Sequence, residues 1–118
     1  MSAVRASALL LGLVLAPALA QAHAYLSHAS PLVGSTVKSA PSEVRLWFTQ
    51  ALEPKFTAAQ LRSSSGAVVA SGGVDAADPR QIVIRARALP PGSYKVFWKV
   101  LSVDTHLTEG SFGFEVKP

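Results

Sequence analysis

The sequence predicts an all-β fold, a small Greek-key antiparallel β-sandwich of about seven strands. Apolar and polar residues alternate with a period of two along most of the chain, as in strands with one face on a core and one toward water. Turn-forming glycine, proline and serine separate these segments every eight to twelve residues or so, the spacing typical of sandwiches.

Four strands are predicted most clearly. They alternate apolar core positions with polar ones and comprise residues 43–48, 81–87, 94–100 and 111–117. Weaker patterns predict further strands at residues 24–29, 58–63 and 67–70.

Turn chemistry sets the expected boundaries. Gly72-Gly73 and Asp78-Pro79 are predicted to form turns, as is the segment 90–92 (PPG). Residues 37–41 and 51–56 are each expected to hold a helical turn.

The first 22 residues have the layout of a secretory signal peptide. Arg5 precedes an apolar run at residues 8–15, and Ala20-Gln21-Ala22 fits an A-x-A cleavage site before His23. A competing site at residues 18–20 would leave Gln21 first. The apolar run is shorter than the roughly 20 residues of a membrane-spanning helix. We therefore expect a cleaved signal peptide at 1–22, export, one domain at 23–118, and no stable membrane insertion after cleavage.

Composition excludes several classes of function. Loss of Arg5 reduces the net charge from +4 to +3, and the longest basic cluster is Arg85-Ala86-Arg87, so nucleic-acid binding is not expected. The chain has no cysteine, which excludes disulfides, thiolate metal sites and thiol redox chemistry. Its one methionine is Met1, which leaves with the signal peptide.

The chemistry of the site must come from few residues, since the chain has three histidines. In extended chain, Asp104 and His106 point to the same side, so their side chains can meet at one point. A carboxylate and an imidazole there suit Cu(II), Ni(II) or Zn(II). The same tripeptide is also typical of an ordinary turn stabilised by a hydrogen bond.

Cleavage before His23 favours a metal site over an ordinary turn at Asp104 and His106. The new terminal amine and the ring Nδ1 of His23 can chelate one ion together, and His106 and Asp104 add a nitrogen and an oxygen. Three nitrogens and a carboxylate favour tetragonal Cu(II), one per chain. Protonation of the amine and imidazoles should weaken binding in acid.

Four segments of the chain follow the pattern of a known family: residues 23–35 (HAYLSHASPLVGS), 45–56 (RLWFTQALEPKF), 89–106 (LPPGSYKVFWKVLSVDTH) and 110–116 (GSFGFEV). With these segments the sequence resembles the CopC family of periplasmic copper-resistance proteins. The resemblance implies a cupredoxin/immunoglobulin-like sandwich in the periplasm. It also implies a Cu(II) site of His23 (amine and ring), Asp104 and His106, with no enzymatic activity. A CopD-like copper transporter of the inner membrane is the implied partner of a monomer.

Two departures from the family pattern bear on this interpretation. Thr105 stands where the family often has glycine, and threonine lacks the access of glycine to positive φ, so a small shift of the loop is expected. Some members hold Cu(I) in a methionine-rich loop, whereas residues 23–118 contain neither methionine nor cysteine. The resemblance is therefore to a Cu(II)-only member.

Several alternatives stay open. His28 is either a surface histidine or an auxiliary ligand, and Glu109 is either a solvated loop residue or a hydrogen-bond partner of a ligand histidine. The whole protein could instead be a copper oxidase or oxygenase with a histidine brace, although an anionic ligand opposes the Cu(I) half of such a cycle. A metal-free immunoglobulin-like interaction module is the third alternative.

Overall fold

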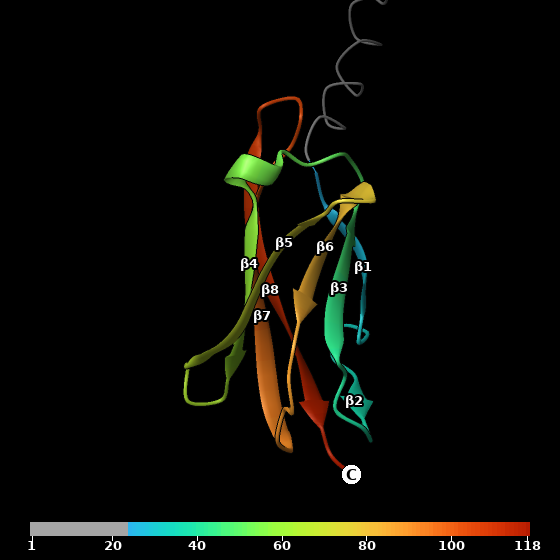
Figure 1. The fold of residues 1–118 in the computed structure, drawn as a ribbon, viewed down its shortest axis with the longest axis vertical. Coiled ribbons are helices and arrows are strands. Elements are labelled where there is room, and N and C mark those ends of the chain that lie inside the picture. Colours follow the sequence, from blue (N-terminus) through green and yellow to red (C-terminus); the bar gives the residue numbers. More distant parts are fainter. Residues whose placement is uncertain (1–23) are drawn as a thin grey trace, which may run out of the picture.

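The computed structural model describes residues 24–118, so the predicted signal peptide at 1–22 and His23 lie outside the described residues. The described chain is almost entirely β-structure (Figure 1). Its elements are β1 (Leu26–Ser30), β2 (Thr36–Val37), β3 (Glu43–Phe48), the 3₁₀ turn η2 (Pro54–Phe56), β4 (Ala58–Ser63), β5 (Val68–Asp75), β6 (Asp78–Arg85), β7 (Gly92–Leu101) and β8 (Leu107–Val116). Within this part of the chain no helix has the length and apolar character to cross a membrane.

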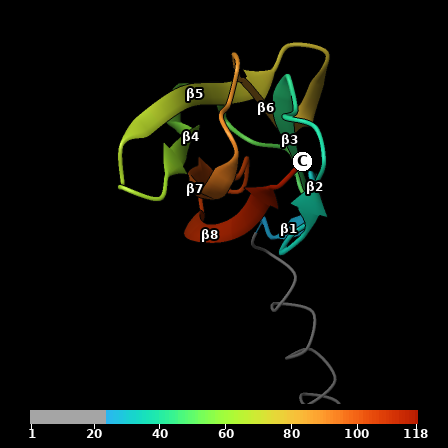
Figure 2. The same ribbon diagram turned by 90° about the horizontal axis from the view of Figure 1, so that it is seen from below.

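The strands form one curled sheet in the order β1-β3-β6-β5-β4-β7-β8-β2. Neighbours are antiparallel except β2 and β8, which are parallel. Viewed along its long axis, the sheet curls so that β3 and β6 lie across the core from β7 and β8 (Figure 2). The predicted all-β Greek-key sandwich is therefore confirmed, with eight strands in place of about seven.

The predicted alternation of core and surface positions is also confirmed. The inward side chains of the four clear strands are at most 6% exposed, apart from partly buried Ala86 and Trp98; the buried ones are Val44, Leu46, Phe48, Ile82, Ile84, Tyr94, Val96, Val100, Phe112, Phe114 and Val116. Each large apolar side chain buried in this way contributes roughly 1.5–3 kcal/mol. Because the chain has no disulfide, this core carries the stability of the fold.

The predicted turn at Gly72-Gly73 is wrong, because both glycines lie inside β5. Gly72 is in register with Ala59 of β4 and with Ile84 of β6, at the point where β5 passes from one partner to the other. A Cβ built on Gly72 would lie 2.0 Å from the carbonyl oxygen of Val83. Glycine is therefore required here by the close approach of two backbones, not by a turn.

Two other local predictions need correction. Asp78-Pro79 begins β6, and the chain turns before it, at residues 76–77. Residues 37–41 form no helical turn; Val37 ends β2, where its carbonyl accepts a hydrogen bond from the N–H of Lys117 at 2.9 Å. Pairing with β8 takes precedence over the local helical preference. The other predicted turn, at 51–56, is confirmed in part by η2.

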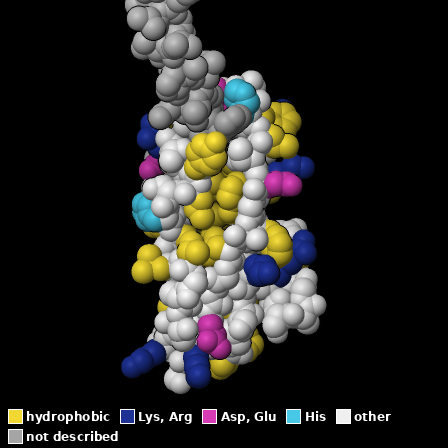
Figure 3. Space-filling model, turned by 180° about the vertical axis from the view of Figure 1, so that it is seen from behind, with side chains coloured by type: hydrophobic (Ala, Val, Ile, Leu, Met, Phe, Trp, Pro, Cys, Tyr) yellow, Lys and Arg dark blue, Asp and Glu magenta, His cyan; other side chains and the backbone are white. Residues whose placement is uncertain are grey.

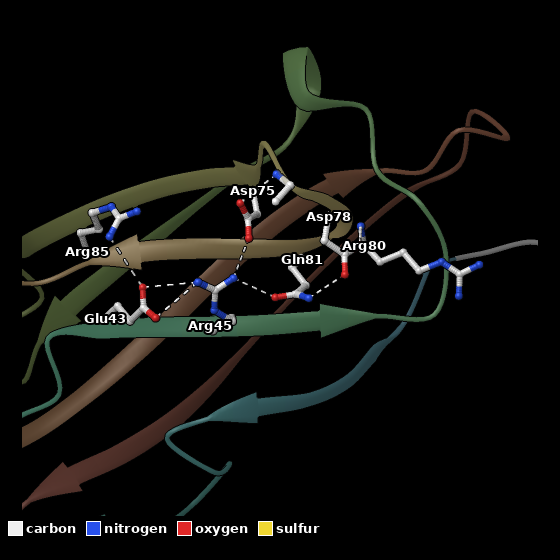
Figure 4. Close-up of polar contacts among 8 residues, drawn as sticks. Glu43, Arg45, Asp75, Asp78, Arg80, Gln81 and Arg85 are labelled. Carbon is white, nitrogen blue, oxygen red and sulfur yellow. Dashed lines mark hydrogen bonds and ion pairs between the residues drawn. The ribbon is translucent and has the colours of Figure 1, made fainter.

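A polar network covers the outer face of β3, β5 and β6 (Figure 4). The Arg45 guanidinium donates hydrogen bonds to Asp75 at 2.7 Å and Gln81 at 2.8 Å, and contacts Glu43 at 3.3 Å. The backbone N–H of Ala77 and then Arg45 hold the pKa of Asp75 below its ordinary value. The network ties the end of β5 to β3, across β6.

The neighbouring glycines Gly72 and Gly73 of β5 give a matched pair of substitutions, because only Gly72 lies against another backbone. Gly72→Ala should lower the free energy of unfolding by about 1–3 kcal/mol, because its Cβ overlaps the Val83 carbonyl. Gly73→Ala should change it by less than about 0.5 kcal/mol, since its Cβ meets only a backbone oxygen at 3.9 Å. Urea unfolding measures both, and equal losses would show that the close approach at Gly72 is not a constraint.

Candidate metal site

Asp104 and His106 lie in the loop that connects β7 to β8, at one end of the sandwich. The two strands stay in register up to the pair Leu101–Leu107, so residues 102–106 close the hairpin. Asp104 Oδ1 is 3.3 Å from His106 Nδ1, and the two side chains are 32% and 46% exposed. The structure thus brings together the two residues that the sequence predicted to face the same way, and leaves them accessible.

Ser102 organises this loop and was missed by the sequence analysis. The residue is fully buried, and its hydroxyl donates a short hydrogen bond to Asp104 Oδ1. The Ser102 Oγ also accepts a hydrogen bond from the backbone N–H of His106 at 3.3 Å. The available clue was its place two residues before Asp104, which puts Ser102, Asp104 and His106 on one side of an extended chain.

The loop is also fixed to the segment that carries η2. The N–H of Val103 donates to the carbonyl of Ala51 at 3.1 Å, and the N–H of Glu53 donates to that of Leu101 at 2.8 Å. Buried Leu52 forms an isolated β-bridge with Ser102. Residues 101–103, at the base of the loop, are therefore held by residues 51–53 as well as by the pairing of β7 with β8.

The charge of the site follows from these contacts. The Ser102 hydroxyl, and after it hydrogen bonds from His106, keep the pKa of Asp104 below its ordinary value. Asp104 is therefore a carboxylate throughout the neutral range. Among residues 24–118 no three histidines or carboxylates gather as possible ligands, so the described part of the chain offers the Asp104–His106 pair.

The beginning of the described chain lies beside this loop. Ala24 is fully buried, and its carbonyl accepts a hydrogen bond from the Thr108 hydroxyl at 2.9 Å. Tyr25 is joined to Thr49 by two hydrogen bonds of 2.9 Å, one in each direction. These contacts fix Ala24 next to the start of β8, two residues after His106.

His28 lies elsewhere on the surface. It is exposed on β1, its ring stacks on Trp47 with centroids 4.4 Å apart, and Nδ1 is 3.2 Å from the Ser27 hydroxyl. Figure 3 shows the two described histidines as separate patches with hydrophobic side chains between them. Glu109 is exposed and in register with Lys99 of β7.

Thr105 adopts φ 73°, a value that favours glycine, although it is a β-branched residue. The backbone at Thr105 therefore lies in a region that favours glycine. The small shift of the loop relative to the family pattern stays a prediction.

This conformation makes Thr105→Gly a stabilising change. Relief of strain contributes about 1–2 kcal/mol, and the extra freedom of glycine in the unfolded chain costs about 0.5–1 kcal/mol. The free energy of unfolding should therefore rise, by up to about 1.5 kcal/mol. Thr105→Ala keeps its Cβ and should gain nothing. Chemical denaturation of the metal-free protein measures both, and a loss of stability in Thr105→Gly would contradict the assignment of strain.

Comparison with known proteins agrees with this architecture. The CopC domain model matches residues 26–117. Copper resistance protein C of Escherichia coli is 38% identical over 116 residues, covering 90% of this chain and 91% of that protein. The copper transport protein CutJ of Bacillus subtilis is 30% identical over 111 residues, which are 92% of this chain and 20% of that protein.

A solved structure gives the same result for the fold. The crystal structure of CopC from Methylosinus trichosporium OB3b superposes with a TM-score of 0.76 at 35% identity, covering 81% of this chain and 95% of that one. Sequence and structure agree over almost the whole described range. The chain belongs to the CopC family.

Proposed function

We propose that the chain is a periplasmic Cu(II)-binding protein of copper resistance and homeostasis, which sequesters the ion or passes it to a membrane partner. The observation that carries the proposal is the Asp104–His106 pair, whose facing atoms are 3.3 Å apart in an exposed loop. Membership of a family whose named relatives are copper-resistance and copper-transport proteins supports copper as the ion and a carrier, not an enzyme, as the class.

The mature N-terminus supplies the remaining ligands in this proposal. The signal peptide at 1–22 is removed, and the domain 23–118 begins with His23. Ala24 is hydrogen-bonded to Thr108, which lies two residues, or roughly 7 Å of extended chain, from His106. One further residue adds about 3.8 Å of reach between Cα atoms, plus an imidazole. The amine and Nδ1 of His23 are thus within reach of an ion held by Asp104 and His106.

The donor set favours Cu(II). Three nitrogens and a carboxylate suit the tetragonal geometry of this ion, which also stands highest in the divalent affinity order. The negative charge of the Asp104 carboxylate, whose pKa the Ser102 hydroxyl lowers, stabilises Cu(II) over Cu(I). No thioether or thiol is present in residues 23–118 to hold Cu(I). We therefore assign a Cu(II)-only site with one ion per chain.

The same charge argues against the oxygenase alternative. A copper enzyme that activates oxygen must cycle through Cu(I), and an anionic oxygen ligand disfavours that state. Acid should release the ion, because protons compete with copper for its donor groups.

The surroundings of the site support transfer to a partner. Four apolar side chains are more than half exposed: Tyr25 at the start of the described chain, Phe56 of η2, Val103 of the β7–β8 loop and Leu107 at the start of β8. In CutJ, a region similar to this chain forms one fifth of a copper transport protein. These observations favour handover from a monomer to a CopD-like copper transporter of the inner membrane.

Substitution of the described ligands tests the site. In protein processed to begin at His23, Asp104→Ala and His106→Ala should each weaken Cu(II) binding by about 100-fold or more, beyond the 10–100-fold typical of residues that only support a ligand. His28→Ala is the matched control and should leave the affinity unchanged. Competition titration with a Cu(II) chelator measures the affinities, and electron paramagnetic resonance the tetragonal geometry. A large loss in His28→Ala with none in His106→Ala would contradict the assignment.

The role of the amine is tested by one added residue. A glycine placed before His23 converts the amine into an amide and removes one donor, so Cu(II) affinity should fall by several powers of ten while the fold is unchanged. Equal affinity of extended and native-start proteins would exclude the amine as a ligand.

A further inference from the structure

Ser102 joins both described residues of the site through one buried hydroxyl. We propose that Ser102 is a positioning residue that sets the Asp104 carboxylate and the His106 backbone in the arrangement that receives the ion, before the ion arrives. The inference rests on the proposed copper-binding function and adds a residue to it.

The donor and acceptor capacity of the Ser102 hydroxyl decides the direction of its hydrogen bonds. A serine hydroxyl has one hydrogen to donate and accepts through its oxygen. Its Oγ is close to Asp104 Oδ1 and also lies 3.2 Å from the His106 carbonyl. That carbonyl already accepts from the Ser102 N–H at 3.0 Å. The hydrogen therefore goes to the charged carboxylate, the stronger acceptor, and the oxygen accepts from the His106 N–H at 3.3 Å.

Burial makes these bonds hard to replace. Ser102 is 0% exposed and lies at the base of the loop, in an isolated β-bridge with Leu52. Removing the hydroxyl takes this acceptor away from the His106 N–H and frees the partly exposed Asp104 side chain to rotate. Binding would then have to order the carboxylate at the moment the ion arrives, a cost that Ser102 removes in advance.

The positive φ of Thr105 is consistent with this role. The Thr105 N–H donates to the Ser102 carbonyl at 2.9 Å, which closes a tight turn through Val103 and Asp104. Ser102 thus fixes the turn by its backbone and the carboxylate by its side chain. A strained backbone conformation persists where surrounding contacts hold it in place. For Thr105 those contacts are the hydrogen bonds of the Ser102 N–H, carbonyl and hydroxyl.

Ser102→Ala tests the inference in processed, full-length mature protein. Cu(II) affinity should fall about 10–100-fold, the range for residues that orient a ligand. Thr105→Ala is the matched control; it removes a hydroxyl of the same loop that contacts the Asp104 carbonyl and not its carboxylate, and should change affinity less than about threefold. Ser102→Thr keeps the hydroxyl and should retain most of the affinity.

A metal-free measurement separates this inference from the proposed function. In apo protein, Ser102→Ala should lower the backbone order parameters of Asp104 and His106 from about 0.85 toward 0.6, while those of β7 stay unchanged. This result does not depend on copper, so failure of the wild type to bind copper would overturn the function and leave the effect of Ser102 on the loop measurable. Unchanged loop order and unchanged affinity in Ser102→Ala would overturn the inference alone.

A double-mutant cycle covers the remaining outcomes. In the Asp104→Ala background, Ser102→Ala should cost little further affinity, because the carboxylate that it orients is gone. Additive losses would show that Ser102 acts only on general stability and would contradict the positioning role. If Ser102→Ala does not fold, Ser102→Thr decides the question, since a folded Thr variant that lost affinity as severely as Asp104→Ala would also contradict it.

Discussion

The pairing of β7 with β8 is the constraint on which the site depends. The two strands are in register over ten pairs, from Gly92–Val116 to Leu101–Leu107, so the position of the connecting loop is fixed by the longest ladder of the sheet. Inward residues of both strands are core residues, and a slip by one residue would reverse every face. The place of Asp104 and His106 is therefore decided by hydrophobic burial far from them, and Ser102 then sets their local geometry.

The second requirement is that the chain start reach this loop. Strand β1 lies at one edge of the sheet and β8 is next to the other, so they approach each other only because the sheet curls. The close crossing at Gly72 allows β5 to pair with both β4 and β6 and so to turn that corner. The hydrogen bond from Thr108 to Ala24 then joins the two ends. In this account, removal of the signal peptide adds the amine and ring of His23 to a site whose other ligands, Asp104 and His106, are already held in place by the folded sheet.

The sequence predicted what depends on periodicity and missed what depends on close tertiary contact. Strand faces and the core follow from a period of two, and the structure confirms them. The approach of Asp104 to His106 is confirmed as well, but it arises in a turn at residues 103–104 and not in extended chain. Gly72 was misplaced in a turn because no local pattern shows that another backbone lies against it. Ser102 was overlooked because its importance comes from burial and from bonds across the loop. The role of His23 stays a prediction, since it lies outside the described residues.

Native mass spectrometry of protein recovered from the periplasm tests the central claim most directly, because one spectrum gives both the N-terminus and the bound metal. The account predicts a chain that begins at His23, takes up one Cu(II) and no second ion of comparable affinity, and loses that ion in acid. A chain that retains its leader and yet holds one Cu(II) as tightly would contradict the claim that cleavage completes the site.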